Sequence, residues 1–165
     1  MADVGVPFAS TGILMEMKSR KTWREKMENP NLPKLVEIPR NMHQRFGEGT
    51  MLVPHPHDVD AFIRTVRKGS VTTVSQIRES LAQKHLADVT CPLTTGIFIR
   101  IAAEAAEEDA RSGKARITPY WRVVKDNGSL NPKFPGGAER QAERLREEGH
   151  RITPGTGKRP PRVAS

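Results

Sequence analysis

The sequence predicts a mainly α-helical protein, and three features support this fold class. Apolar residues recur at helical spacing in segments that begin near Asp58, Val74 and Pro92. Glycine or proline separates these segments, as expected at helix ends. The aromatic content is only 5% of 165 residues, which indicates a packed core smaller than the whole chain. We therefore expect an irregular N-terminal extension over 1–57, a helical domain with short β elements over 58–152, and a disordered basic tail over 153–165.

The predicted extension holds little regular structure. A short basic helix around Trp23 is expected over 18–27, and the prolines that follow it end any helix because proline lacks an amide hydrogen. Residues 34–38 (KLVEI) fit a short strand. Residues 39–57 contain three prolines and three histidines and are predicted to be an extended connection.

The first two helices of the domain have clear boundaries. Asp58 is a suitable N-cap for a helix that Lys68-Gly69 ends, with Val59, Phe62, Ile63 and Val66 on one face. Thr73 followed by Gln76 forms the sequence of a capping box. It opens a second helix that has Val74, Ile77 and Leu81 on one face.

A third helix is expected after a turn at 85–89. It starts at Thr90 to Pro92, runs to about Arg111 and ends at Ser112-Gly113, with Ile97, Ile101 and Ala105 facing inward. A supporting helix followed by two helices around a short turn is the order of a helix-turn-helix. An ordinary helical core fits the same pattern.

The C-terminal part begins with turn signals. Asp126-Asn127-Gly128 predicts a turn, and Lys133 to Gly137 predicts a tight loop that requires glycine dihedral angles. A last helix is expected over 138–148, with Ala138, Ala142 and Leu145 inward and Gly149 at its end.

Charge and cysteine content narrow the class of function. Lys and Arg total 27 against 19 acidic residues, and a net charge of +8 fits either a polyanionic partner or a solvated basic surface. Cys91 is the single cysteine, so an intramolecular disulfide and a cysteine-rich metal site are excluded and a cytoplasmic location is expected. No apolar run reaches the ~18 residues of a membrane span, and the N-terminus does not have the pattern of a signal peptide.

Three sequence blocks occur together in a specific order. They are KGSVTT at 68–73, PYWRVV at 119–124, and FPGG at 134–137 followed by EGH at 148–150. With this order and spacing, residues 60–150 resemble the DNA-binding domain of O6-alkylguanine-DNA alkyltransferases and their alkyltransferase-like relatives. The resemblance implies a winged-helix-like helix-turn-helix domain in the minor groove of double-stranded DNA, with a base rotated into a pocket.

The residues at the family's reactive positions differ from the family pattern. Tyr120 stands where the resemblance implies the nucleophilic cysteine, Trp121 stands at the activating histidine, and Glu148 keeps the glutamate position. A phenol with a reference pKa of about 10 and no neighbouring base is a poor alkyl acceptor. We therefore expect a protein of the alkyltransferase-like branch, without a catalytic residue and without a cofactor, that recognises O6-alkylguanine in DNA repair.

Two further departures concern the rotation of the base. The family has an arginine at the start of the recognition helix, where this chain has residues 91–96 (CPLTTG), and Arg100 comes more than a turn later. Val74 replaces the family's tyrosine, and the connection over 106–117 is longer than in the family. We therefore expect rotation of the base to be inefficient or absent.

The expected site residues each have a structural alternative. The predicted lesion pocket consists of Tyr120, Trp121, Phe134, Pro135, Gly136 and Gly137. The predicted DNA contacts are Thr72, Thr73, Gln76, Thr94, Thr95, Gly96, Arg100 and Arg122. In the alternative, the aromatic pair is buried under the Phe134 loop, Arg122 braces the motif, and the threonines cap helices.

Other residues give weaker signals. Cys91 at a helix N-terminus is either a displaced nucleophile or a core residue, and core is favoured. His43, His55 and His57 lack further ligands, so a metal site is not expected. We expect a monomer that binds duplex DNA and a repair-protein partner; the alternatives are an alkyltransferase that uses Cys91 and a protein-interaction module.

Overall fold

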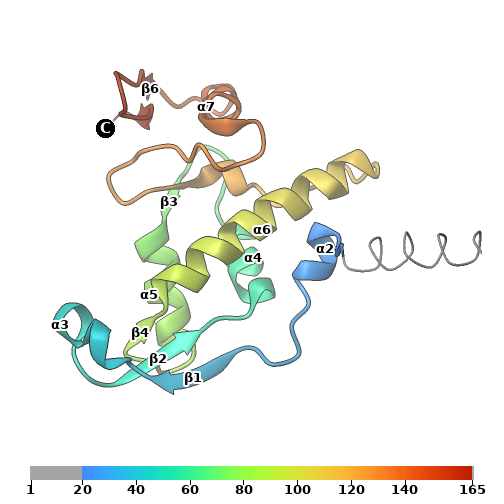
Figure 1. Cartoon of the computed structure of the whole chain (residues 1–165). Helices are drawn as coiled ribbons and strands as arrows, with labels where there is room; N and C mark the ends of the chain where they lie inside the picture. Colours follow the sequence, from blue (N-terminus) through green and yellow to red (C-terminus); the bar gives the residue numbers. More distant parts are fainter. Residues whose placement is uncertain (1–19, 165) are drawn as a thin grey trace, which may run out of the picture.

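A long helix organises the fold. The computed structural model describes residues 20–164, so residues 1–19 of the predicted extension lie outside the described part. Helix α6 (Pro92–Arg111) runs through the middle of the described part (Figure 1), and helices α4 (Pro56–Arg64) and α5 (Val74–Lys84) pack against it. Ala102, Ala103 and Ala106 have no exposed surface, and their small size allows close helix packing. The mainly α prediction is confirmed.

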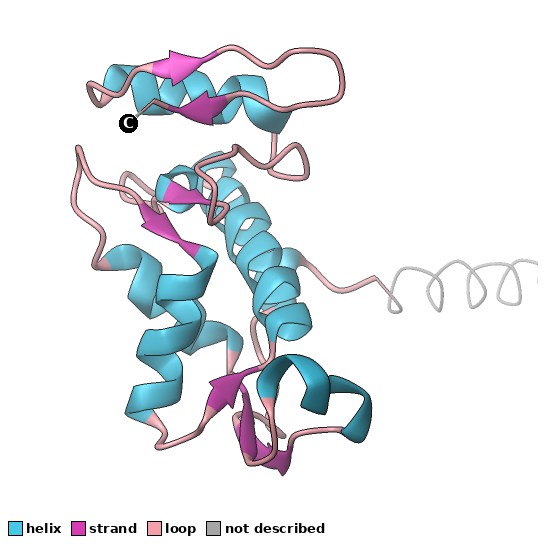
Figure 2. Ribbon diagram, turned by 90° about the vertical axis from the view of Figure 1, so that its left-hand side faces the viewer, coloured by secondary structure: helices cyan, strands magenta, loops and turns pink. Residues whose placement is uncertain are grey.

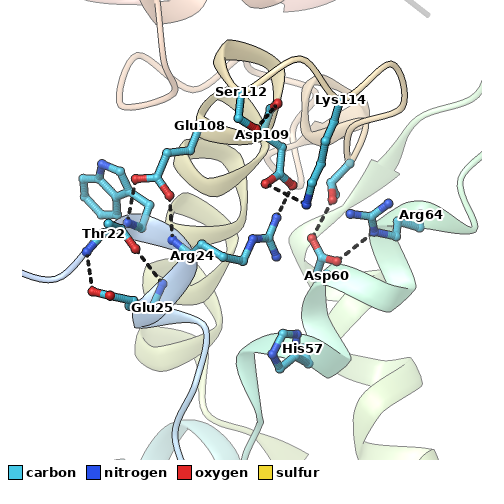
Figure 3. Close-up of polar contacts among 12 residues, drawn as sticks. Thr22, Arg24, Glu25, His57, Asp60, Arg64, Glu108, Asp109, Ser112 and Lys114 are labelled. Atoms are coloured by element: carbon cyan, nitrogen blue, oxygen red, sulfur yellow. Dashed lines mark hydrogen bonds and ion pairs between the residues drawn. The ribbon is translucent and has the colours of Figure 1, made fainter.

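The short helix α2 (Trp23–Lys26) is fastened to α6. It opens with a capping box between Thr22 and Glu25. The Glu108 carboxylate on α6 accepts hydrogen bonds from the backbone N–H groups of Trp23 and Arg24, both at 2.9 Å (Figure 3). The Arg24 side chain pairs with Asp109 one residue further along α6. The predicted basic helix is therefore present, but it is short.

A small sheet lies at one end of the molecule. Strands β1 (Lys34–Glu37) and β2 (Thr50–Val53) are antiparallel, with Leu35 opposite Leu52, and β2 pairs in parallel with β4 (Val89–Thr90). The 3₁₀ helix η1 (Arg40–Met42) and helix α3 (His43–Phe46) connect β1 to β2.

The prediction that 39–57 is an extended connection is wrong. Proline is compatible with the first turn of a helix, so Pro39 caps η1 and Pro56 begins α4. The segment also contains β2, whose four residues are too few for a clear alternation.

Residues 20–57 contribute to the core of the helical domain. Met27 is fully buried and Leu52 is 1% exposed, and both belong to the cluster that contains Val59 and Ile63. These side chains cover apolar surface of α4 and α6, so the described part of the predicted extension belongs to the folded domain, and the expected domain boundary at residue 58 is wrong.

The helix boundaries differ most from the prediction at α4, which ends at Arg64 rather than at Lys68-Gly69, so Val66 lies outside it. Helix α7 (Gly137–Glu147) is shifted by one residue from the predicted 138–148. His55 is the N-cap of α4, because its Nδ1 accepts a hydrogen bond from the His57 amide at 3.0 Å, so Asp58 as N-cap is wrong. Asp58 pairs instead with Lys84 and His85. The capping box of Thr73 and Gln76 on α5 is confirmed, and so is the end of α6 at Ser112.

One predicted inward residue on α6 faces solvent. Ile97 is 47% exposed, whereas Ile99 is 2% exposed and Ala105 is buried. The buried face of α6 is formed mostly by the alanines of its second half, and Ile97 does not lie on that face. Leu93, one turn earlier, is 72% exposed.

The C-terminal part of the chain contains a second apolar cluster. The 3₁₀ helix η2 (Tyr120–Arg122) leads into β5 (Val123–Val124), which pairs in parallel with β3 (Thr72–Thr73). Helix α7 (Gly137–Glu147) follows the glycine loop, in which Gly136 and Gly137 have φ of 78° and 73°. Leu130, Ala142 and Leu145 form the core of this part.

The predicted disorder of 153–165 is wrong for the residues that the structure describes. Strands β6 (Ile152–Thr153) and β7 (Arg162–Val163) are antiparallel, and Figure 2 shows them beside α7. The Pro161 carbonyl accepts a hydrogen bond from the Leu130 amide at 2.9 Å, and the Val163 amide donates to Gly128 at 3.0 Å. Composition alone could not predict this, because the ordering contacts come from residues 128–130, far from β6 and β7 in the sequence. No helix in 20–164 has the length and apolar character needed to cross a bilayer.

Candidate nucleic-acid interface

Tyr120 is sealed inside the protein. Its side chain is 1% exposed and contacts Trp121 and Phe134 edge to face, with ring centroids 5.4 and 5.3 Å apart. The phenol donates a hydrogen bond to Glu107 Oε1 at 3.1 Å. Burial and the adjacent Glu107 carboxylate raise the pKa of the Tyr120 phenol well above its ordinary value. The phenolate, the nucleophilic form, is therefore strongly disfavoured.

Arg122 serves as a brace. Its Nε and Nη2 donate to the Glu148 carboxylate at 2.9 and 2.6 Å, and its Nη1 donates to the Val66 carbonyl at 2.6 Å. Burial alone would raise the pKa of the Glu148 carboxyl, but hydrogen bonds and the positive charge of Arg122 outweigh burial and lower the pKa. Glu148 thus orients the guanidinium of Arg122.

Trp121 borders an open cavity. The cavity has a volume of about 620 Å³ and extends from the C-terminal end of α6 to η2. Arg144 of α7 lies over the Trp121 ring at 4.3 Å from its centroid and donates to Glu107 at 2.7 Å. The indole is therefore half-buried and held in a fixed orientation.

The cavity is lined by basic side chains and by no acidic one. The basic residues are Arg64, Lys114, Arg116, Arg122 and Arg144. Two of them pair with carboxylates that are more deeply buried: Asp60 is 9% exposed where Arg64 is 44% exposed, and Asp109 is 8% exposed where Lys114 is 61% exposed (Figure 3). Arg64 and Lys114 are therefore positioned by buried carboxylates while both also line the cavity, which suits an anionic ligand.

The six predicted lesion-pocket residues do not line a single cavity. Tyr120 and Phe134 are buried, as in the structural alternative, and only Trp121 borders the basic cavity. Pro135 and Gly136 line a separate cavity of about 470 Å³ together with three glutamates, Glu107, Glu139 and Glu143. Gly137 begins α7.

The predicted DNA contacts around α5 take part in the helix cap. Thr72 is 5% exposed and its hydroxyl donates to Gln76 Oε1 at 3.1 Å. The same oxygen accepts from the Thr73 amide, and the Thr73 hydroxyl accepts from the Gln76 amide. The capping alternative therefore accounts for the contacts of all three side chains.

The predicted contacts on α6 divide into two groups. The hydroxyls of Thr94 and Thr95 donate to the Cys91 carbonyl, and Thr95 has no exposed surface. Gly96 and Arg100 are exposed on the same helix, and the Arg100 guanidinium lies 6.0 Å from the ring centroid of Trp23.

The remaining candidates have structural surroundings. Cys91 is 9% exposed and packs with Ile38 and Met51, in a different apolar cluster from Tyr120. His57 pairs with Glu28 at 2.7 Å and stacks on His55, and no group of three potential metal ligands occurs among residues 20–164.

Most of the cavity residues were not predicted from the sequence. Arg64, Lys114, Arg116 and Arg144 come from α4, the connection after α6, and α7. The spacing of Asp60 and Arg64 at i and i+4 was an available signal, because residues at this spacing pair on a helix surface. Nothing in the sequence indicates that the connection after α6 lies beside η2.

Comparison with known proteins gives little similarity at the sequence level. No protein-family model matches the chain, and no curated protein matches it. The fold is similar to that in the crystal structure of S. pombe Atl1 in complex with damaged DNA containing O6-carboxymethylguanine. The two chains are 18% identical with a TM-score of 0.47, and the likeness covers 66% of this chain and 87% of that chain.

Proposed function

We propose that this protein binds duplex DNA noncovalently and transfers no alkyl group. The observation that carries this proposal is the position of Trp121, a half-buried indole at the wall of a cavity whose charged lining residues are all basic. Cations facing a cavity attract phosphates, and an aromatic face stacks on an extruded base.

The finer part of the proposal concerns the ligand. We infer that the extruded nucleotide is an O6-alkylated guanine, because Trp121 follows Tyr120 in the block that resembles the alkyltransferase motif. A lesion weakens base pairing, so a damaged base costs less free energy to extrude than a normal one. Arg144 covers part of the indole, so the incoming base stacks on the remaining exposed surface.

Two features support binding without covalent chemistry. Tyr120 is buried and its phenol is held protonated beside Glu107. Cys91, the single cysteine of the chain, is packed in the cluster of Ile38 and Met51 rather than at η2. Neither side chain reaches the basic cavity, since neither lines it.

Fluorescence anisotropy tests the proposal with two duplexes that differ only in the O6-methylation of one guanine. We expect tighter binding to the methylated duplex at fixed salt, and we expect Trp121→Ala to remove the difference. Trp23→Ala is the matched control, because Trp23 is the other tryptophan of the chain and lies on α2. Thermal unfolding of both variants establishes that each remains folded.

Each contrary outcome has a distinct meaning. Equal affinity for the two duplexes would leave DNA binding but remove lesion recognition. Absence of any salt-dependent affinity would remove the DNA function and favour a protein-interaction module. A covalent alkyl label that disappears in Cys91→Ala would identify an alkyltransferase.

A further inference from the structure

The C-terminal hairpin, which consists of β6, β7 and the loop between them, encloses a second cleft together with the turn at 126–129. Its volume is about 410 Å³, and it lies apart from the Trp121 cavity, with which it shares no lining residue. The polar side chains that line it are two arginines, three hydroxyls and one amide: Arg159, Arg162, Ser129, Thr153, Thr156 and Asn127. All of these are groups that bind phosphate oxygens in proteins.

The charge of the hairpin is entirely positive. Residues 149–165 contain four Lys or Arg residues and no Asp or Glu. Across residues 20–164, no ion pair involves Arg159 or Arg162. This differs from the Trp121 cavity, where Arg64, Lys114 and Arg144 each have a carboxylate partner. The two arginines of the cleft therefore keep their full charge for a ligand.

The backbone holds the two arginines in place. Arg162 lies in β7 and pairs with Ser129 across a β-bridge, and the Arg159 amide donates to Thr156 at 2.9 Å. Gly155 allows this tight loop, because a Cβ there would overlap the Arg159 carbonyl oxygen and lie 3.0 Å from the carbonyl carbon of Pro160. An ordered backbone reduces the conformational entropy that is lost when an arginine binds a ligand.

We propose that this cleft binds a backbone phosphate of DNA. The inference rests on the proposed function, since the phosphate belongs to the duplex bound at the Trp121 cavity. A guanidinium presents its N–H donors in a fork that matches phosphate geometry. A membrane headgroup is disfavoured, because none of the large exposed apolar residues of 20–164 lies in the hairpin.

The salt dependence of DNA binding tests the proposal. For duplex DNA, the magnitude of the slope of log Kobs against log salt concentration falls by about 0.9 for each phosphate that the protein no longer neutralises. We expect the slope of the double variant R159Q/R162Q to be smaller by about this amount. Its affinity for damaged and undamaged duplexes should fall by about the same factor relative to wild type. R159K/R162K keeps the charge and should retain most of the slope.

A matched control separates a local contact from overall charge. The double variant K34Q/R40Q also removes two positive charges. These lie near β1, at the opposite end of the molecule from the hairpin (Figure 1). We expect its slope to equal that of the wild type. Thermal unfolding checks that each double variant remains folded.

The outcomes distinguish this inference from the proposed function. Wild-type binding with equal slopes for R159Q/R162Q and K34Q/R40Q would overturn the cleft as a phosphate site and leave the function intact. No salt-dependent binding by the wild type would overturn both.

Discussion

Arg122 and Glu148 join η2 to the C-terminal end of α7 through hydrogen bonds from two guanidinium nitrogens to one carboxylate. The third guanidinium nitrogen of Arg122 donates to Val66, in the connection after α4. With side-chain exposures of 13% and 8%, this pair is screened little by solvent. One arginine therefore holds three segments together beside Trp121, with its guanidinium carbon 5.7 Å from the centroid of the indole.

Removing the carboxylate should destabilise the protein. Glu148→Gln leaves the buried Arg122 charge without its partner, which costs roughly 3 kcal/mol of unfolding free energy. Urea unfolding measures the loss. The double variant R122Q/E148Q removes both charges and should recover part of the stability, and purely additive losses would contradict direct coupling of the two residues.

The same pair should make stability depend on pH. The folded-state pKa of Glu148 is lowered from its ordinary value of 4.5, so its contribution is fully present above that value. The contribution is lost as the pH falls through 4.5 toward the folded-state pKa. We expect the wild type to lose more stability than Glu148→Gln between about pH 5.5 and about pH 3, a window that contains the ordinary carboxyl pKa and extends below it. Parallel curves would mean that Glu148 is not responsible.

The helices could be predicted from the sequence because their signals are local. Thr73 and Gln76 lie three residues apart, and Ser112-Gly113 directly follows α6. The sheet and the hairpin depend on partners far along the chain. Leu35 lies opposite Leu52 in the sheet although η1 and α3 separate them in the sequence. The Pro161 carbonyl accepts its hydrogen bond from the Leu130 amide, 31 residues earlier. No local pattern encodes such contacts.

Tyr120 should remain un-ionised in alkaline solution for as long as the protein is folded. It is the only tyrosine in the chain, so ultraviolet absorbance near the phenolate band reports on it alone. Because burial raises its pKa above the ordinary 10.0, we expect no phenolate signal until the protein unfolds. A titration midpoint near 10 with intact circular dichroism would show that the phenol is accessible.

Cys91 should react slowly with thiol reagents. The folded chain buries this thiol against Ile38 and Met51, so modification requires local opening. We expect the reaction rate with a disulfide reagent to rise by at least about tenfold in denaturant, which corresponds to an opening free energy above roughly 1.4 kcal/mol. Fast labelling of the native protein would restore Cys91 as a candidate nucleophile.

The domain should not fold without residues 20–57. Leu52→Ala is expected to cost roughly 3 kcal/mol, because it opens a cavity in the shared core. Leu35→Ala is the matched control, since Leu35 lies opposite Leu52 in the register but is 52% exposed. A truncated chain that starts at residue 58 should have no cooperative unfolding transition, whereas a cooperative transition would establish the boundary expected from the sequence.

The candidate site was harder to predict than the fold. The sequence correctly drew attention to Trp121, but Thr72, Thr73 and Gln76 hydrogen-bond to one another in the cap of α5. Helix caps and phosphate contacts use the same hydroxyl and amide groups, so residue type alone does not separate them. Arg122 was among the predicted DNA contacts, but the other four basic residues of the cavity were missed because three separate segments bring them together.

Because Glu108 of α6 accepts hydrogen bonds from two amides of α2, formation of helix α2 depends on contact with α6. Four residues are too few for a helix to persist in water, and the two amides that would otherwise lack partners are held by a carboxylate from another helix. An ordered backbone at Trp23 therefore indicates that the C-terminal half of α6 is packed against α2. Amide exchange at Trp23 would act as a local sensor of that docking, readable without any ligand.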